Sequence, residues 1–515
     1  MLMQALRPLA AVAALVALVV AGSNANAQTN YTTVGEPQDK IVISSGVDVV
    51  ALNALDIVPI VPDRMLMDHI SDQLAQTDKE GNIIPWLATS WKNIDPLTWE
   101  ITLRKGVKFQ DGEVFNANAV KFFYDLMRDP KFKSPSKSNH SWTTAVDIVD
   151  DYTVRIHTAK PDPVMPGRLT LAQAVPPEYI KKVGIDGYRK KPIGTGAYRL
   201  TEHVRDDHVT LEAFDGWWAG KPKIKTIVYR PIKEAAARVS ALLAGEIDLA
   251  FDVPPELMPL IERAKNASIK RTLSVRTYFL FLNTINKAYP TTKREVREAI
   301  NYAIDRESLN KNILGGTGAP AAWLNPHTFG INPALKPIPY DPDRAKKLLA
   351  EAGYPNGVDL DFDAFQGRYI KDKELAEAIA GQLNKVGIRA HLKINDWGFY
   401  VKKMWSHQSA PIDLLAWVDN VGDPDVQNYR VLQTGGNWSQ NSDPELDKLM
   451  GQIASEMNPE KRKALIMKQQ DYMRHSFPIA YLLQMGILCG VSPKLSWWEP
   501  APNDAHRFYQ VKATN

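Results

Sequence analysis

The sequence predicts an α/β fold divided into two or three lobes. Three observations lead to this prediction. The chain has 515 residues, of which 44% are hydrophobic and 23% charged, an ordinary globular balance. Strand-like apolar runs alternate with amphipathic helical segments along most of the chain. At roughly 100–200 residues per domain, the length exceeds what one compact lobe usually holds.

Two segments show the helical pattern clearly. Residues 293–305 place apolar side chains on one helix face, at Val296, Ala299, Ile300, Ala303 and Ile304. A second helix is expected to begin at Asp341-Pro342, because Asp caps a helix and Pro suits its first turn. Gly353 is placed to close it in a left-handed conformation.

Two other segments predict a helix followed by a strand. Residues 371–386 read as a helix that Gly387 ends, and residues 388–394 then alternate as a half-buried strand. Residues 235–244 read as a helix that Gly245 ends before the strand that begins at Ile247. The apolar stretch 477–491 contains proline and two glycines and is predicted to be a buried strand pair, not a membrane span.

The first 27 residues have the layout of a secretory signal peptide. Arg7 is followed by an apolar run at 9–21, which is too short to span a bilayer, and by Ala25-Asn26-Ala27. Cleavage is predicted between Ala27 and Gln28. The mature protein is therefore expected to be exported.

The net charge and the cysteine content limit the kinds of partner, covalent link and metal site that the chain can have. Lys plus Arg number 62 and Asp plus Glu 58, a net charge of +4 that favours no nucleic acid partner. Cys489 is the only cysteine, so a disulfide within the chain, a multi-cysteine metal site and a lipoprotein anchor are all excluded. The lack of disulfides and of an anchor predicts a soluble protein of a bacterial periplasm. A monomer is expected.

Signatures of common enzymes are absent from the sequence. It contains no G-x-S-x-G elbow, no H-E-x-x-H and no Walker A loop. The glycines at 315–318 follow a helix and predict a turn, not a phosphate cradle. His203 and His208 flank a polar turn that favours a solvated loop over a metal site. No cofactor is expected, and an exported hydrolase with a carboxylate pair stays the enzymatic alternative.

Five motifs occur in a specific order. They are IPWLATSW at 84–91, TWEITLRKGVKFQDG at 98–112, PIGTGAY at 192–198, REAINYAIDR at 297–306 and GDPD at 422–425. From about residue 40 to the C-terminus the chain resembles the family-5 extracytoplasmic solute-binding proteins. These are the dipeptide-, oligopeptide- and nickel-binding receptors of ABC importers.

The resemblance implies a type II periplasmic binding protein fold, with two α/β lobes, two hinge strands and an inserted domain. Lobe I would combine residues 28–62, 196–283 and 485–515, with the insert at 63–195 packed on it. Lobe II would be residues 284–484. The hinge strands would lie near 278–283 and 479–484, and closure of the lobes on a ligand would signal to the membrane permease.

The resemblance also implies ligand-binding positions near Trp417. In the peptide-binding members, an aspartate three residues after this Trp accepts the ammonium group of the ligand. Asn420 stands at that position here, so the charge is lost unless the adjacent Asp419 replaces it. A structural role of both residues in the turn before Gly422 is the alternative.

The other implied ligand-binding residues lie in four segments. Arg368 stands two residues after the position of the arginine that pairs with the ligand carboxylate in dipeptide binders, with a surface arginine as the alternative. Trp397 and Trp417 would each offer an aromatic face to the ligand, with core packing as the alternative. The turn at Ser45-Gly46 and the segment ending at Trp142 are weaker candidates.

The sequence therefore predicts a non-enzymatic receptor for a small peptide or peptide-like solute. Loss of the acid at Asn420 and the shifted Arg368 leave an opine, an oligosaccharide or a metal chelate as alternative ligands. A periplasmic scaffold or chaperone is a further alternative.

Overall fold

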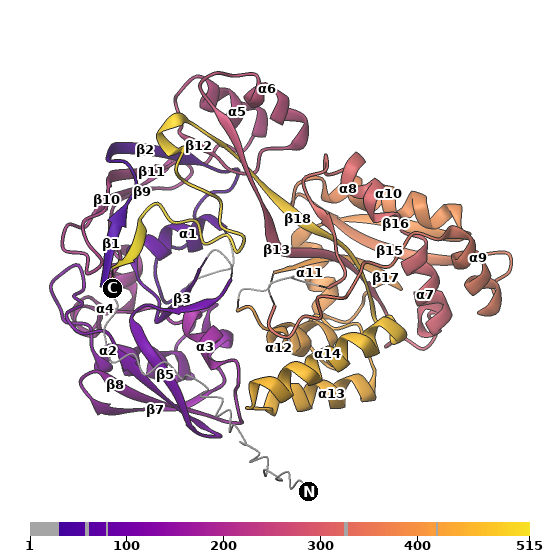
Figure 1. Ribbon diagram of the computed structural model, residues 1–515, viewed down its shortest axis with the longest axis horizontal. Helices are drawn as coiled ribbons and strands as arrows, with labels where there is room; N and C mark the ends of the chain where they lie inside the picture. The colour runs from indigo at the N-terminus through magenta and orange to yellow at the C-terminus, as the bar shows by residue number, and fades with distance from the viewer. Residues whose placement is uncertain (1–29, 57–60, 79–80, 324–327, 419–420, 515) are drawn as a thin grey trace, which may run out of the picture.

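Two bodies joined by a pair of long strands make up the molecule (Figure 1). The computed structural model describes residues 30–56, 61–78, 81–323, 328–418 and 421–514. One body contains the first part of the chain and the C-terminal strand, and the other contains α7 to α14. The predicted signal peptide and its cleavage site lie outside the described residues.

Eleven strands of the described residues form one sheet that runs through both bodies. Its order is β16-β15-β17-β13-β18-β12-β2-β11-β10-β9, and β14 pairs with β18 beside this path. The strands are β2 (Gln38–Ser44), β9 (Tyr198–Val204), β10 (His208–Ala213), β11 (Ile224–Tyr229), β12 (Leu249–Ala250), β13 (Ser268–Leu282), β14 (Ala319–Pro320), β15 (Val358–Gln366), β16 (Ile388–Asp396), β17 (Ile412–Val418) and β18 (Ile479–Val491).

The strands β13 and β18 connect the two bodies. They pair antiparallel from Ser268↔Val491 to Phe281↔Ile479, with an irregularity between Leu273 and Thr277. The predicted strand pair at 477–491 is wrong, because this stretch forms the single strand β18. Its partner is a distant segment, so its glycines stay in extended backbone. Gly486 is needed for close approach, since a Cβ there would lie 2.3 Å from the Thr317 carbonyl oxygen.

The first body carries three smaller sheets. A four-stranded antiparallel sheet has the order β5-β6-β8-β7, and β3 pairs with β4. Strand β1 pairs with β19, so the two ends of the described chain lie side by side. The strands are β1 (Asn30–Val34), β3 (Ala75–Thr77), β4 (Ile83–Pro85), β5 (Ala88–Asp95), β6 (Thr98–Leu103), β7 (Thr143–Asp150), β8 (Thr153–Thr158) and β19 (Gln510–Thr514).

The helix ends that carry a cap or glycine signal are confirmed, because such signals are local, whereas the helix predicted at 293–305 ends earlier, at Tyr302. The Asp341 side chain accepts a hydrogen bond from the Arg344 N–H at 2.9 Å and caps α9. The residues Gly245, Gly353 and Gly387 all have φ between 77° and 92° at the ends of α5, α9 and α10. These helices and the one predicted at 293–305 are α5 (Ala235–Leu243), α7 (Arg294–Tyr302), α9 (Pro342–Glu351) and α10 (Asp372–Lys385).

The remaining helices cover the sheets and the boundary between the bodies. They are α1 (Val61–Ile70), α2 (Ala117–Arg128), α3 (Met165–Arg168), α4 (Pro177–Lys190), α6 (Met258–Glu262), α8 (Arg306–Asn312), α11 (Trp397–Trp405), α12 (Pro424–Gln427), α13 (Pro444–Ser455) and α14 (Pro459–Ser476). Among the described residues, none of the helices has the length and apolar character needed to cross a membrane.

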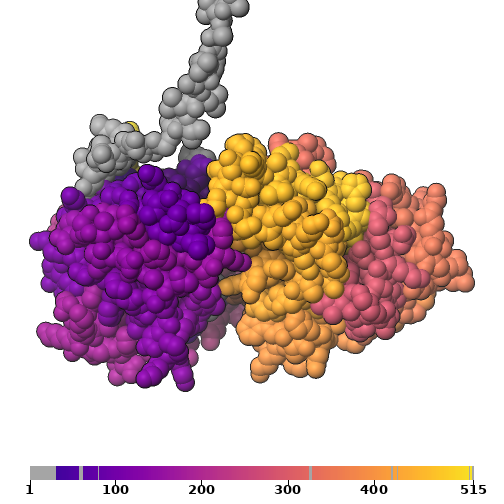
Figure 2. Space-filling model, turned by 90° about the horizontal axis from the view of Figure 1, so that it is seen from below, coloured from indigo at the N-terminus to yellow at the C-terminus, as the bar shows by residue number. Residues whose placement is uncertain are grey.

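Each body has its own large hydrophobic core. The core of the first body surrounds Trp86 and Tyr198 and includes the buried thiol of Cys489. The core of the second body surrounds Phe279 and Phe362 on the sheet. Figure 2 shows the two bodies in contact along a seam on the face seen from below.

Both polar turns singled out in the sequence are confirmed as turns. Gly315 and Gly316 have positive φ between α8 and β14. The imidazole of His208 lies between Glu202 and Asp207, at 3.0 and 2.8 Å, in the β9–β10 hairpin. Within the described ranges, His, Cys, Asp and Glu side chains nowhere form a group of three that could hold a metal ion.

Candidate functional site

Three half-buried tryptophans form an aromatic surface in the second body, which we call the tryptophan platform. Trp397 begins α11, Trp417 lies near the end of β17, and Trp438 precedes α13. The ring of Trp438 is stacked on Trp397 with centroids 6.4 Å apart, and it meets Trp417 edge-on at 6.3 Å. Within the described part of the chain, none of the three indole nitrogens has a hydrogen-bond partner. The platform therefore offers aromatic faces and free donors.

Arg368 lies against this platform. The loop after β15 is held by the Asp372 carboxylate, which accepts hydrogen bonds from the Arg368 and Tyr369 N–H groups at 2.8 and 3.0 Å. The guanidinium lies 5.5 Å from the Trp397 ring and 5.2 Å from the Tyr369 ring. Its Nε is buried without a partner, and no carboxylate of the described residues lies within ion-pair distance of it. Arg368 is thus an oriented cation that lacks an anion.

Two aspartates lie near this region, one in the first body and one in the C-terminal segment, and the Arg368 charge acts on the first of them, Asp252. Asp252 follows β12 and Asp504 precedes β19, and both have left-handed backbone, with φ of 55° and 60°. Arg276 of β13 donates to the Asp504 carboxylate at 3.2 Å and lies 5.1 Å from the Tyr369 ring. The Tyr369 ring is therefore in contact with both Arg276 and Arg368.

The carboxylate of Asp252 is accessible to solvent although protein surrounds it. This enclosure raises the pKa of Asp252 by desolvation, and the neighbouring Asp504 charge adds to the increase. The guanidinium groups of Arg238, Arg276 and Arg368 act in the opposite direction. An accessible acid of this kind can exchange its water for a ligand cation.

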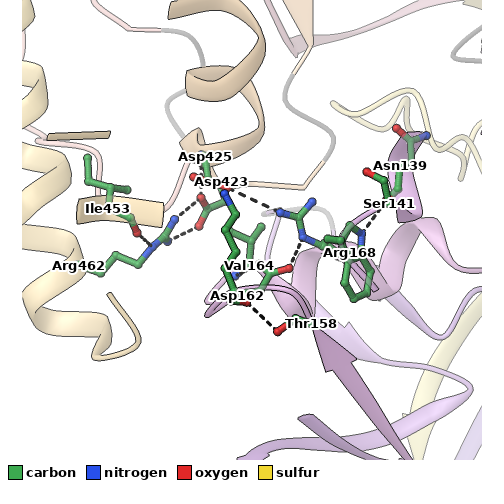
Figure 3. A network of polar contacts seen from close by, with 12 residues as sticks. Asn139, Ser141, Thr158, Asp162, Val164, Arg168, Asp423, Asp425, Ile453 and Arg462 are labelled. Carbon is green, nitrogen blue, oxygen red and sulfur yellow. Dashed lines mark hydrogen bonds and ion pairs between the residues drawn. The ribbon is translucent and has the colours of Figure 1, made fainter. Parts of the chain in front are cut away.

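Polar contacts join the two bodies (Figure 3). Arg168 of α3 donates to Asp162 at 2.6 Å and lies 3.7 Å from Asp425 of α12 in the other body. Arg462 of α14 holds the adjacent Asp423 with both terminal nitrogens, within 2.7 Å. Burial raises the pKa of Asp425, whereas Arg168 and Arg462 lower it.

Three further contacts cross the boundary. Arg430 donates to the Asn139 side chain at 3.3 Å, and Lys371 lies 2.9 Å from Glu256. A Cβ at Gly167 would lie 2.8 Å from the Val421 carbonyl oxygen, so the backbones approach closely there. The two bodies are therefore in direct contact.

The structure brings together three of the predicted ligand-binding residues, and three others have contacts of their own. Arg368, Trp397 and Trp417 belong to one surface. The Ser45 hydroxyl is buried and bonded to the Tyr229 hydroxyl at 2.7 Å, and a Cβ at Gly46 would lie 3.0 Å from the Arg238 guanidinium. Trp142 donates to the Asn139 carbonyl at 2.7 Å and packs against Tyr124 and Arg168. Asp419 and Asn420 lie outside the described residues.

Sequence reasoning missed Trp438, Asp252 and the pair of Arg276 with Asp504. Trp438 lies in a loop without a motif. Asp252 precedes Val253-Pro254-Pro255, which marks a loop but gives no sign that its carboxylate lies near Arg368, far along the chain. These residues are brought together by the sheet order, which places β12, β13 and β18 side by side.

An α/β fold of two bodies with an aromatic and charged surface at their boundary is typical of solute-binding proteins. The family described as "Bacterial extracellular solute-binding proteins, family 5 Middle" matches residues 82–439. The chain belongs to this family. Its fold is the type II periplasmic binding protein fold, as predicted.

Individual relatives agree with this assignment. The glutathione-binding protein GsiB of Escherichia coli (strain K12) is 28% identical over 450 residues, which cover 84% of this chain and 86% of that protein. The structure of DppA from Helicobacter pylori in complex with the peptide STSA superimposes with a TM-score of 0.78 at 24% identity, covering 93% and 99% of the two chains. NikA from Brucella suis in complex with Fe(III)-EDTA gives 0.82 at 25%, covering 92% and 100%.

Proposed function

We propose that the protein is the periplasmic receptor of an ABC importer and binds a small peptide or peptide-like solute that carries a free carboxylate. The two bodies close on the solute and present it to the membrane permease. The protein acts as a monomer without cofactor or turnover. Residues 1–27 are its export signal, cleaved before Gln28.

The observation that carries this proposal is the Arg368 guanidinium. A partly buried cation without a counter-ion is costly, and a carboxylate in bidentate contact removes that cost. The faces of Trp397 and Tyr369 hold the guanidinium in place, so a ligand carboxylate meets an oriented partner. An uncharged oligosaccharide would leave this cation unpaired.

The other end of the ligand is assigned to the Asp252 carboxylate. Asn420 can accept a hydrogen bond from an ammonium group but supplies no charge. Asp252 lies close enough to Arg368 for the Arg368 charge to lower its pKa. A ligand with separated charges, such as a peptide, can thus pair its ammonium with Asp252 and its carboxylate with Arg368.

Closure is supported by the contacts across the boundary, where Arg168 meets Asp425 and Lys371 meets Glu256. The hinge would be the pair of strands β13 and β18. In this proposal lobe I comprises residues 28–62, 196–283 and 485–515, the inserted domain residues 63–195, and lobe II residues 284–484.

The relatives bind ligands that fit the same chemistry. Glutathione is a tripeptide with carboxylates and one ammonium group, and the STSA peptide has one of each. An opine or a metal chelate also carries carboxylates, so Arg368 suits these as well. They are the alternative ligands that the experiment must separate.

Native mass spectrometry of the protein purified from its own periplasm tests the proposal. We expect a bound peptide or peptide-like compound, and thermal shift with the released compound should reproduce the stabilisation. If an opine or a chelate is released instead, the assignment as a receptor stands but the assigned ligand is no longer a peptide. Cleavage of the bound compound during incubation, or an empty protein that no solute of a broad panel stabilises, would contradict the proposal.

A further inference from the structure

A small, partly enclosed pocket lies in the second body and shares no residue with the tryptophan platform. It is formed where α8, α14 and β18 meet, and its walls include Arg306, Trp323, Met473, Arg474, Phe477 and Tyr481. Its cavity volume is about 20 Å³. This is room for one water molecule or one monatomic ion, and it excludes solutes the size of a peptide.

Two buried hydrogen-bond donors of this pocket have no partner. The indole Nε1 of Trp323 and the hydroxyl of Tyr481 are both buried, and neither has a partner among the described residues. The two rings pack against each other with centroids 5.3 Å apart. Leaving a buried donor of this kind unpaired is unfavourable, so an occupant of the pocket that accepts hydrogen bonds is favoured.

The pocket is also positively charged. Arg306 is 4% exposed, and its guanidinium is bonded only to neutral oxygens, among them the Tyr481 carbonyl at 2.6 Å and the Asn301 carbonyl at 3.1 Å. In the described structure no carboxylate lies within ion-pair distance of Arg306 or Arg474. Burial and the neighbouring Arg474 lower the pKa of Arg306 to about 9.

The C-terminal end of α14 lies beside the pocket, but its carbonyls do not repel an anion there. The C-terminal carbonyls of α14 would repel negative charge if they were free. The Ser476 and Phe477 carbonyls, however, accept hydrogen bonds from Arg297 at 3.1 and 3.0 Å. Their partial charge is therefore compensated by a third guanidinium.

We propose that this pocket binds a small monatomic anion, with chloride as the ion of the right size and charge. The anion accepts hydrogen bonds from Trp323 and Tyr481 and neutralises Arg306 and Arg474. A water molecule would satisfy the donors but not the charge. Because Tyr481 belongs to β18 and Arg474 to α14, the bound ion ties the strand that joins the two bodies to a helix of the second body. This inference does not depend on the identity of the transported solute.

Thermal unfolding in sodium chloride and in sodium gluconate at equal ionic strength tests the proposal. Gluconate is too large for the pocket, so we expect a higher midpoint in chloride that rises with its concentration. Crystals grown in sodium bromide should show an anomalous peak between Trp323 and Tyr481. Equal midpoints in the two salts, or a water molecule in place of bromide, would overturn the proposal.

Variants link the effect to this pocket. Tyr481→Phe and Arg474→Gln each remove one partner and should raise the apparent Kd for chloride about tenfold or more. Tyr340→Phe, an exposed tyrosine outside the pocket, is the matched control and should leave the chloride dependence unchanged. If Arg474→Gln misfolds, Tyr481→Phe alone decides. A chloride effect that survives in every folded pocket variant would show an adventitious ion only and refute the site.

Discussion

Tryptophans gather in both bodies of the molecule, but their indole nitrogens end in different surroundings. In the first body, Trp86, Trp217 and Trp218 donate to the carboxylate of Asp72 at 2.8, 3.3 and 2.9 Å. Asp72 is fully buried, and Arg104 stacks on Trp218 at 4.3 Å. In the second body, the tryptophan platform has no acceptor for any of its indoles within the described residues and stays half exposed.

The difference shows that the role of an aromatic cluster depends on whether its indole N–H groups find acceptors within the protein. The Asp72 cluster is complete within the protein, so its function is to hold β4, α1 and the segment after β10 together. The tryptophan platform is incomplete without something from outside. The following predictions test this contrast, beginning with the largest expected effect.

Asp72→Ala should destabilise the first body strongly. It leaves three indole donors without an acceptor in a buried site, so the free energy of unfolding should fall by about 3 kcal/mol or more. Denaturant unfolding measures the change. Asp215→Ala removes an exposed carboxylate paired with Lys221 and should cost less than about 1 kcal/mol. Equal losses for the two variants would contradict the contrast.

The Asp72 cluster should also show a pH dependence of stability. Burial raises the pKa of Asp72 to about 6, although the three indole hydrogen bonds act against it. The folded state therefore binds more protons than the unfolded state between about pH 4 and 6, and the contribution of Asp72 to stability falls as pH rises through this window.

Asp72→Asn removes this titration while it keeps an acceptor oxygen. The free energy of unfolding of the wild type, relative to Asp72→Asn, should decrease by on the order of 3 kcal/mol between about pH 4 and 6. Buried His69, whose pKa is lowered to about 4, is unchanged in both proteins and cancels in the comparison. A difference that does not vary with pH would refute the assignment.

Trp397→Leu should mainly weaken ligand binding, whereas the Asp72 variants mainly change folding stability. It shortens the platform, so ligand affinity should fall about tenfold, measured by isothermal titration with the solute released from the native protein. The loss of stability should be smaller than for Asp72→Ala, because the side chain is only half buried. Unchanged affinity would remove Trp397 from the site.

Trp405→Leu should have the smallest effect. Trp405 contacts Trp438 edge-on at 5.7 Å, but it is 54% exposed. Affinity should change less than about twofold and the free energy of unfolding by about 0.5 kcal/mol or less. A large loss of affinity would extend the platform to this residue.

The sequence predicts well what is determined locally. Asp341, Gly353 and Gly387 mark helix ends because caps depend on neighbours in the chain. The prediction of a buried strand within residues 477–491 is correct. The expected pairing within this stretch is wrong, because no local signal indicates that its partner is β13.

The candidate site is only partly predictable for the same reason. Arg368, Trp397 and Trp417 follow from the resemblance to a family, and the structure places them together. Ser45 is expected from the sequence to face a ligand, but its hydroxyl is bonded to Tyr229, which lies 184 residues away. Asp252 and Trp438 acquire their positions from the order of strands in the sheet, which no local pattern encodes.

The central claim is that the Arg368 guanidinium binds the carboxylate of the solute. The most direct measurement is the affinity of the wild type and of Arg368→Gln for the native peptide and for its C-terminal amide, with Arg205→Gln as the exposed control. We expect the wild type and the control to prefer the acid about tenfold to hundredfold, and Arg368→Gln to lose this preference. A wild type that binds acid and amide equally, or a variant that keeps the preference, would contradict the account.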